Sequence, residues 1–164
     1  MAFDAYLQIE GIEGDATDAN HLGWIQLQSY SHNVKNETTG QSMGGHHTGG
    51  RCHHEDILVI KPLDGSSPSL ALACCQGKSH PSAVIELCRS GASGLDMVPY
   101  QKVELTDVVV TGVAPKAGEN DEFPIEQIRM TYGSIKWTYT KTDTSGRPTG
   151  EVVTGWDLKQ NTNL

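Results

Sequence analysis

The sequence predicts a mainly β protein, an antiparallel β-barrel made of two packed sheets, with one α-helix on its flank. Most of the 164 residues alternate between apolar and polar side chains, which is typical of strands that bury one face. Residues 67–76 depart from this pattern, because their residues 70–75 form a continuous apolar run that follows Pro68 and precedes Gly77. No repeat, charge run or linker divides the chain, so we expect a single domain over residues 1–164.

The strands expected in the first half of the chain follow this alternation. Residues 3–9 place every second, apolar side chain on one face. A polar loop over residues 14–23 leads to a second strand over residues 24–34. Residues 57–60 are a continuous apolar run, which predicts a strand buried on both faces and ended by Pro62.

Three further strands are expected in the second half. Residues 83–89 alternate again, residues 103–113 form a long strand that bends near Asp107, and residues 152–158 close the sheet. With the strand described next, these segments predict seven to nine strands in total.

The strand expected over residues 125–140 changes face at Gly133. Its large side chains fall at even positions as far as Tyr132 and at odd positions from Ile135 onward. A β-bulge at Gly133 would turn the second half of the strand, as the curvature of a barrel requires. The backbone at this glycine is expected to take a conformation that is costly for a branched residue.

One helix is expected, over residues 67–76. We interpret Ser67 as its N-cap, Pro68 as the first helical residue and Gly77 as the left-handed residue that ends it. Serine, proline and glycine in this order mark both ends of the helix clearly.

Apolar side chains surround the axis of this helix. Leu70 and Ala73 follow the spacing of a stripe that faces a core, whereas Leu72 lies on another face. One core contact would therefore leave apolar surface in water, and a second surface must cover it. That surface is either a loop of the same chain or a neighbouring subunit. In the second case Leu70, Leu72 and Ala73 belong to the subunit interface.

Composition excludes several classes of partner. The chain has 20 acidic residues against 12 lysines and arginines, a formal charge of −8, and no basic run. Nucleic acid and anionic membranes are therefore not expected as partners. The N-terminus has no basic and apolar leader, and no stretch reaches the ~18 apolar residues of a membrane span, which predicts synthesis that ends in the cytoplasm. The four cysteines are expected to be reduced and buried.

Histidine and cysteine gather at residues 46–54. His46, His47, Cys52, His53 and His54 are potential zinc or copper ligands, but their spacing matches neither a C-x2-C nor an H-E-x-x-H site. Adjacent residues on a strand also point to opposite faces. We therefore predict no metal, no cofactor and no enzymatic activity. A monomeric β-barrel that binds a small ligand in its interior and a metal-dependent hydrolase built on these histidines remain as alternatives.

Five short motifs are spread in order from one end of the chain to the other: Phe3-Asp4-Ala5-Tyr6 with Ile9, Ser29-Tyr30-Ser31-His32, Asp64 with Ser66-Ser67-Pro68 and Leu70, Ala73-Cys74-Cys75-Gln76-Gly77-Lys78, and Gly155-Trp156-Asp157-Leu158-Lys159-Gln160-Asn161. Their joint order and spacing resemble the haemolysin-coregulated protein (Hcp) family, the tube subunit of the bacterial type VI secretion system.

This resemblance implies an assembly. In that family six subunits close into a ring, and rings stack into a tube inside a contractile sheath. The expected partners are therefore further copies of the chain, the spike, baseplate and sheath proteins, and small secreted effectors carried in the lumen. Export would need no signal peptide, because the apparatus ejects the tube itself. We expect no toxin domain, since the chain stops at Leu164, just past the shared ending.

Two segments are assigned to this assembly. Ser29 and Ser31 share the parity of Ile25 and Leu27, so small polar side chains stand where a core is expected, and this face is expected to line the lumen. The alternative is that Ser31 only bonds a neighbouring backbone group. The glycine-rich loop over residues 39–50 is too long for a simple hairpin and is expected to join stacked rings through Thr39, Gly40, Met43, Gly44, Gly45, His46, His47, Gly49 and Gly50.

Overall fold

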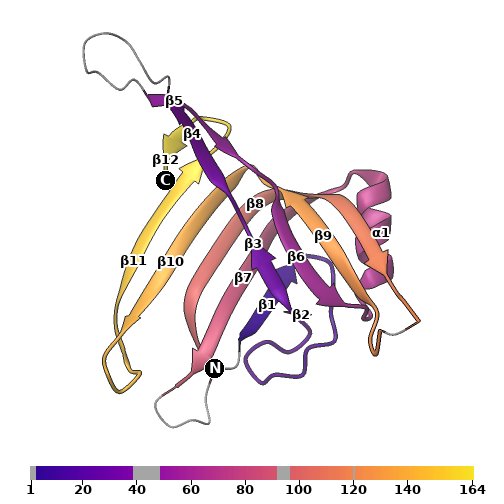
Figure 1. Cartoon of the computed structure of the whole chain (residues 1–164). Coiled ribbons are helices and arrows are strands. Elements are labelled where there is room, and N and C mark those ends of the chain that lie inside the picture. The colour runs from indigo at the N-terminus through magenta and orange to yellow at the C-terminus, as the bar shows by residue number, and fades with distance from the viewer. Residues whose placement is uncertain (1–2, 39–48, 92–96, 120) are drawn as a thin grey trace.

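The computed structural model describes residues 3–38, 49–91, 97–119 and 121–164, and it shows two antiparallel sheets with one helix beside them (Figure 1). In chain order the elements are β1 (Asp4–Ile9), β2 (Ile25–Leu27), β3 (Ser29–Ser31), β4 (Val34–Thr38), β5 (Gly49–His54), β6 (Ile57–Pro62), α1 (Ser67–Gln76), β7 (Ser79–Ser90), β8 (Met97–Lys116), β9 (Ile125–Thr131), β10 (Ser134–Thr142), β11 (Pro148–Asp157) and β12 (Thr162–Asn163).

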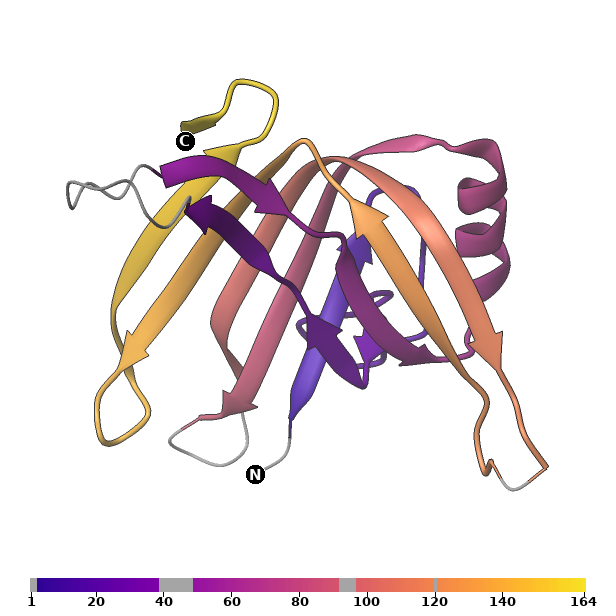
Figure 2. The same ribbon diagram turned by 45° about the horizontal axis from the view of Figure 1, so that its top comes forward.

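The long strand β8 belongs to both sheets. Hydrogen bonds join ten strands into one folded-over sheet, and its two halves meet at β8 (Figure 2). One half, which we call the larger sheet, has the order β12-β11-β10-β8-β7-β1-β2, and the other half, the smaller sheet, continues from β8 through β9 and β6 to β3. Within the part of the chain that the structure describes, strands β4 and β5 pair only with each other. Residues 101–106 of β8 pair with β10, whereas residues 109–116 pair with β9. The expected two packed antiparallel sheets with one flanking helix are confirmed. A closed barrel does not form among the described residues, because the strand order ends at β12, β2 and β3 and no pairing joins these end strands to one another.

The strand expected over residues 24–34 is split between the two sheets at Gln28. Leu27 is the last residue of β2, and the backbone N–H of Gln28 already donates to Ile60 O of the smaller sheet at 2.7 Å. The side chains that face the core change from odd to even positions at the same point: Leu27 is buried, and the next side chain that packs against the core is Tyr30. This split and the hairpin β4–β5 help to explain why twelve strands are described where seven to nine were predicted.

Strand β8 bends at Asp107, as predicted. Leu105 is buried before the bend and Val108 after it, so the core-facing side chains change from odd to even positions. Asp107 takes a left-handed backbone conformation, with φ of 49°, which explains the shift of one residue.

Gly133 lies opposite this bend, between β9 and β10, and the predicted change of face there is confirmed. Its N–H donates to Thr106 O at 2.8 Å, and the chain passes from one sheet to the other. The expected reason is wrong, because its φ is not left-handed. A Cβ at this position would instead lie 3.1 Å from Asp107 Cβ and 3.2 Å from Lys159 Cε, so the neighbouring side chains leave little room.

The space between the sheets is filled by large aliphatic side chains. The prediction that β6 is buried on both faces is wrong, since its burial alternates and Leu58 and Ile60 are partly exposed. The fully or almost fully buried apolar side chains include Leu7, Ile9, Ile25, Ile57, Val59, Leu70, Ile85, Val103, Leu105, Ile128, Met130 and Ile135.

Helix α1 has the predicted bounds and packs on β8. Gly77 ends it with φ of 59°, as expected, but Ser66 rather than Ser67 occupies the N-cap position. The Ser67 hydroxyl is instead hydrogen-bonded to Glu126 on β9. Across the described residues, the structure contains no helix with the length and apolar character of a membrane span.

Candidate functional site

One side of α1 is apolar and exposed. Leu70 and Ala73 are 0% and 4% exposed and hold the helix against the sheet, so they belong to the core of this chain. Leu72 is 56% exposed, and the neighbouring Ala71 and Cys75 are exposed as well. Of the three helix residues predicted for an interface, Leu72 is therefore the one that a partner can reach.

An apolar groove of about 330 Å³ runs beside this exposed face. The helix and the last part of β8 form its sides, and Leu63, before the helix, is 45% exposed at the same place. The residues that line it are Leu63, Ser67, Ala71, Cys74, Cys75, Val113, Pro115 and Glu126. Apolar surface of this kind typically marks a contact with another protein chain.

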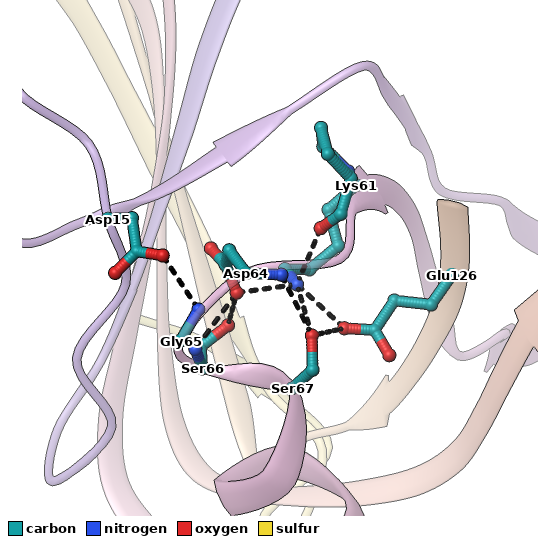
Figure 3. Close-up of polar contacts among 8 residues, drawn as sticks. Asp15, Lys61, Asp64, Gly65, Ser66, Ser67 and Glu126 are labelled. Carbon is teal, nitrogen blue, oxygen red and sulfur yellow. Dashed lines mark hydrogen bonds and ion pairs between the residues drawn. The ribbon is translucent and has the colours of Figure 1, made fainter. Parts of the chain in front are cut away.

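A buried lysine fixes the start of α1. Lys61, on β6, is 0% exposed, and its Nζ lies 2.6 Å from Glu126 Oε1 and 2.8 Å from Asp64 Oδ1 (Figure 3). It also donates to Pro62 O at 2.8 Å and to Ser67 Oγ at 3.2 Å. This charge is thus shared between two carboxylates and two neutral oxygens, which offsets the cost of burying it.

The loop before the helix is tied to the same network. Asp64 Oδ1 accepts hydrogen bonds from the backbone N–H of Ser66 at 2.9 Å and from its hydroxyl at 2.5 Å. Burial raises the pKa of Asp64, but the hydrogen bonds from Lys61 and Ser66 outweigh it and lower the pKa. The N–H of Gly65 donates to Asp15 Oδ2 at 2.7 Å, which links the loop to the segment between β1 and β2. The helix is therefore held rigidly where its apolar face is presented.

Sequence reasoning did not single out Lys61. Its position in the strand could have indicated its burial, because Lys61 follows Ile57 and Val59 at every second residue, on the buried face of β6. A lysine on the buried side of a strand needs acidic partners, and the sequence alone could not show that Glu126, 65 residues away, provides one.

The predicted lumen residues lie on β3, at the edge of the smaller sheet. Ser31 is exposed and Ser29 is partly exposed, while Tyr30 between them packs against the core and burial raises its pKa to about 12. Because the parity changes at Gln28, the two serines face away from the core rather than into it. The structure therefore brings both hydroxyls to the same open face.

The hairpin of β4 and β5 extends past the two sheets toward the C-terminal end of the chain (Figure 1). Gly49 and Gly50 begin β5, and a Cβ on Gly50 would lie 2.2 Å from Glu37 O, so this close pairing requires glycine. The other residues of the predicted stacking loop, 39–48, lie outside the described residues.

Two histidines close the root of this hairpin. His32 Nε2 and His54 Nδ1 lie 2.6 and 3.0 Å from the hydroxyl of Tyr132. Burial lowers the pKa of both histidines, and the charge of His54 adds to the effect on His32. Tyr132 can donate its one proton to one neutral ring and accept an N–H from the other, so the cluster is satisfied without positive charge.

Within the described residues, the predicted histidine cluster does not converge on one point. His54 faces Tyr132, whereas the adjacent His53 is exposed on the other side of β5. Such divergence is expected of neighbours on a strand. His46 and His47 lie outside the described residues.

A second exposed apolar patch lies on β10 and β11, at the opposite end of the molecule from α1 (Figure 1). Tyr139 and Val152 are paired across the two strands and are 47% and 50% exposed. Tyr139 has the same parity as the buried Ile135, so it lies on the core-facing side of the larger sheet. The smaller sheet does not cover this end, and both side chains remain accessible.

Comparison with known proteins identifies the family. The family model for "Type VI secretion system effector, Hcp" matches residues 6–139. The chain belongs to the Hcp family. It is also 26% identical over 162 residues to "Protein hcp1" of Pseudomonas aeruginosa, with 98% of both chains covered. The resemblance drawn from the five motifs is thus confirmed.

One further sequence relative and one solved structure are also similar to this chain. The "Major exported protein" of Pseudomonas aeruginosa is 26% identical to this Hcp chain over 166 residues, covering 89% of this chain and 94% of the relative. A solved "Structure of a type six secretion system protein" covers 99% of this chain and is itself covered in full, with 27% identity and a TM-score of 0.93.

Proposed function

We propose that this Hcp chain is a structural tube subunit, of which six copies close into a ring and rings stack into a tube that the type VI apparatus ejects. The observation that carries the proposal is the exposed apolar face of α1 on a chain with a formal charge of −8. Membership of the Hcp family supports the same role. A monomeric barrel with an internal ligand is disfavoured, because aliphatic side chains fill the space between the sheets.

A ring also needs a second, different patch, because its interface is head-to-tail. The patch formed by Tyr139 and Val152 lies at the opposite end of the molecule from α1, where a neighbouring copy could reach it. We propose that Leu72 of one copy packs against Tyr139 and Val152 of the next. The rigid mount of α1 on the Lys61 network would keep the angle between neighbours constant, as closure requires.

Charged substitutions in the two patches test this arrangement. Leu72→Glu and Val152→Glu should each convert rings into monomers, because either change places a charge in an apolar contact. Val153→Glu is the matched control: it makes the same change on the same strand, at a valine that is 51% exposed on the other face of the sheet. This control should keep the ring mass in light scattering.

Mixing the two defective variants gives a sharper result. Leu72→Glu keeps an intact β10–β11 patch, and Val152→Glu keeps an intact α1, so an equimolar mixture can form one good junction. The expected product is a dimer of one copy of each variant, which cannot grow further. A mixture that stays monomeric would show that these two patches do not meet.

We assign the carriage of small effectors to the face of β3. Ser31→Gln should leave the ring mass unchanged and reduce the amount of effector that co-purifies, because a longer side chain narrows the lumen. Ser145→Gln, at an exposed turn between β10 and β11, is the control. If both variants retained the same amount of effector, Ser29 and Ser31 would not line the lumen.

Stacking and export complete the proposal. The loop over residues 39–50 would contact the next ring, so shortening it should abolish tubes seen by microscopy while the rings keep their mass. The chain would be made in the cytoplasm and leave through the type VI apparatus, in contact with its spike, baseplate and sheath. A relative named "Major exported protein" supports export.

A further inference from the structure

A buried cluster on the outer face of the larger sheet lies apart from the surfaces assigned to the tube. His21, in the loop between β1 and β2, is 1% exposed, and Cys88 on β7 is also 1% exposed. The side chain of Glu86, also on β7, is 16% exposed. Among the described residues, one ligand atom of each of these three lies within 4.8 Å of the others.

The imidazole ring of His21 is held in one orientation. Its Nδ1 lies 2.7 Å from Asp18 Oδ2. Tyr6 stacks on the ring with the centroids 4.1 Å apart, and Trp24 meets it edge-on at 4.9 Å. A carboxylate on the second nitrogen is the usual partner of a metal-binding histidine, because it fixes both the tautomer and the direction of the free nitrogen.

The free nitrogen of that ring points at the other two donors. His21 Nε2 lies 2.9 Å from Glu86 Oε2 and 3.9 Å from Cys88 Sγ. Donors of a tetrahedral zinc site lie roughly 3.3–3.6 Å apart, given metal bonds of about 2.0–2.3 Å. The two distances from His21 Nε2 are therefore within a few tenths of an ångström to about 0.7 Å of that spacing, and the carboxylate of Glu86 and the thiol of Cys88 lie within 4.8 Å of each other. Small movements of the Glu86 and Cys88 side chains would bring nitrogen, oxygen and sulfur around one centre.

We propose that His21, Glu86 and Cys88 bind a divalent cation of the zinc type, with Asp18 positioning the histidine. The exchange is balanced in charge: the ion replaces the proton between His21 Nε2 and Glu86 and the thiol proton of Cys88, and both protons leave to solvent. The net charge of the buried cluster is therefore unchanged. The ion joins the loop between β1 and β2 to strand β7 and stabilises their contact.

This site is independent of tube formation, and sequence spacing could not show it. Glu86 and Cys88 lie 65 and 67 residues from His21 along the chain. Antiparallel pairing of β1 with β7 and the loop that follows β1 bring them together.

The experiment is a titration of chelator-treated, dialysed protein with Co²⁺ and Zn²⁺. We expect one Co²⁺ per chain with a near-ultraviolet thiolate-to-cobalt charge-transfer band, and a melting temperature that rises with Zn²⁺. Cys88→Ser should lose both the band and the Zn²⁺-dependent rise. His21→Gln should lose tight binding as well, and a cooperative melting transition of each variant without metal would show that the loss is not a folding defect.

Two further variants test the positioning role of Asp18 and the choice of cysteine. Asp18→Asn should keep the charge-transfer band but weaken binding by roughly 10–100-fold, as expected for a positioning residue. Cys52→Ser is the control, because Cys52 is next to the exposed His53. A wild-type protein without the band, a band that survives Cys88→Ser, or a band lost in Cys52→Ser would each overturn the proposal.

Discussion

At the scale of single residues, burial of charge distinguishes this fold from a simple apolar core. Lys61 is fully buried and Glu126 is 2% exposed, and their 2.6 Å contact joins β6 to β9 beneath the helix. A buried pair of this kind adds little net stability, because desolvation of both ions offsets their attraction. Its value here is positional, since Ser67 and Asp64 bind to the same lysine.

Lys61→Met should destabilise the chain by roughly 3–5 kcal/mol, because it leaves two carboxylates near the core without their cation. The double variant Lys61→Met with Glu126→Gln should recover part of this loss, since a buried charge is removed with its partner. Urea denaturation of the two variants measures the difference. Equal destabilisation of single and double variants would contradict the view that unpaired charge, rather than lost packing, is the cause.

At the scale of elements, the alternation of side chains predicted strands well and predicted their breaks poorly. The helix bounds followed from Pro68 and Gly77, which act locally. The break at Gln28 has no local signal, because the chain changes sheets there only to pair with Ile60. Gly133 carried a visible change of parity, but its physical reason is the proximity of Asp107 and Lys159, which are distant in sequence.

Gly133→Val should lower stability by roughly 1–3 kcal/mol, because the added methyl groups enter space already occupied by Asp107 and Lys159. Gly133→Ala should cost less, since one carbon can be accommodated by small shifts. The comparison distinguishes crowding from backbone strain, to which alanine and valine would both be sensitive. An unchanged melting temperature in Gly133→Val would contradict the close approach.

The hairpin of β4 and β5 should be sensitive to pH. Burial lowers the pKa of His32 and His54 below 6.5, so the unfolded chain takes up protons first as the pH falls. The contribution of these two neutral histidines to the free energy of unfolding is therefore fully present above pH 6.5. It is lost as the pH falls from there through their lowered pKa values. When both rings are protonated, neither can accept the Tyr132 hydroxyl proton, so one of the two hydrogen bonds is lost.

His54→Gln should reduce this loss of stability, because glutamine can bond Tyr132 without titrating. His53→Gln, which changes the exposed neighbour on the same strand, should leave it unchanged. Urea denaturation between pH 7.5 and 5.5 measures both slopes. Equal slopes for wild type and His54→Gln would mean that the cluster does not carry the pH dependence.

At the scale of the whole molecule, two different apolar patches lie at opposite ends of the folded protein. A head-to-tail ring requires two such patches on each copy. The sequence predicted the helix patch from apolar residues on every side of α1, although the structure assigns Leu70 and Ala73 to the core and leaves Leu72 exposed. It did not predict the patch of Tyr139 and Val152, because their exposure arises only where the larger sheet extends past the smaller one.

Ring closure can be measured by native mass spectrometry of the wild-type chain at micromolar concentration. We expect one dominant species of six times the 17.7 kDa chain mass, and no ladder of open oligomers, because the last junction closes the ring. A stable monomer at that concentration, or a continuous series of oligomers without a preferred size, would contradict ring formation.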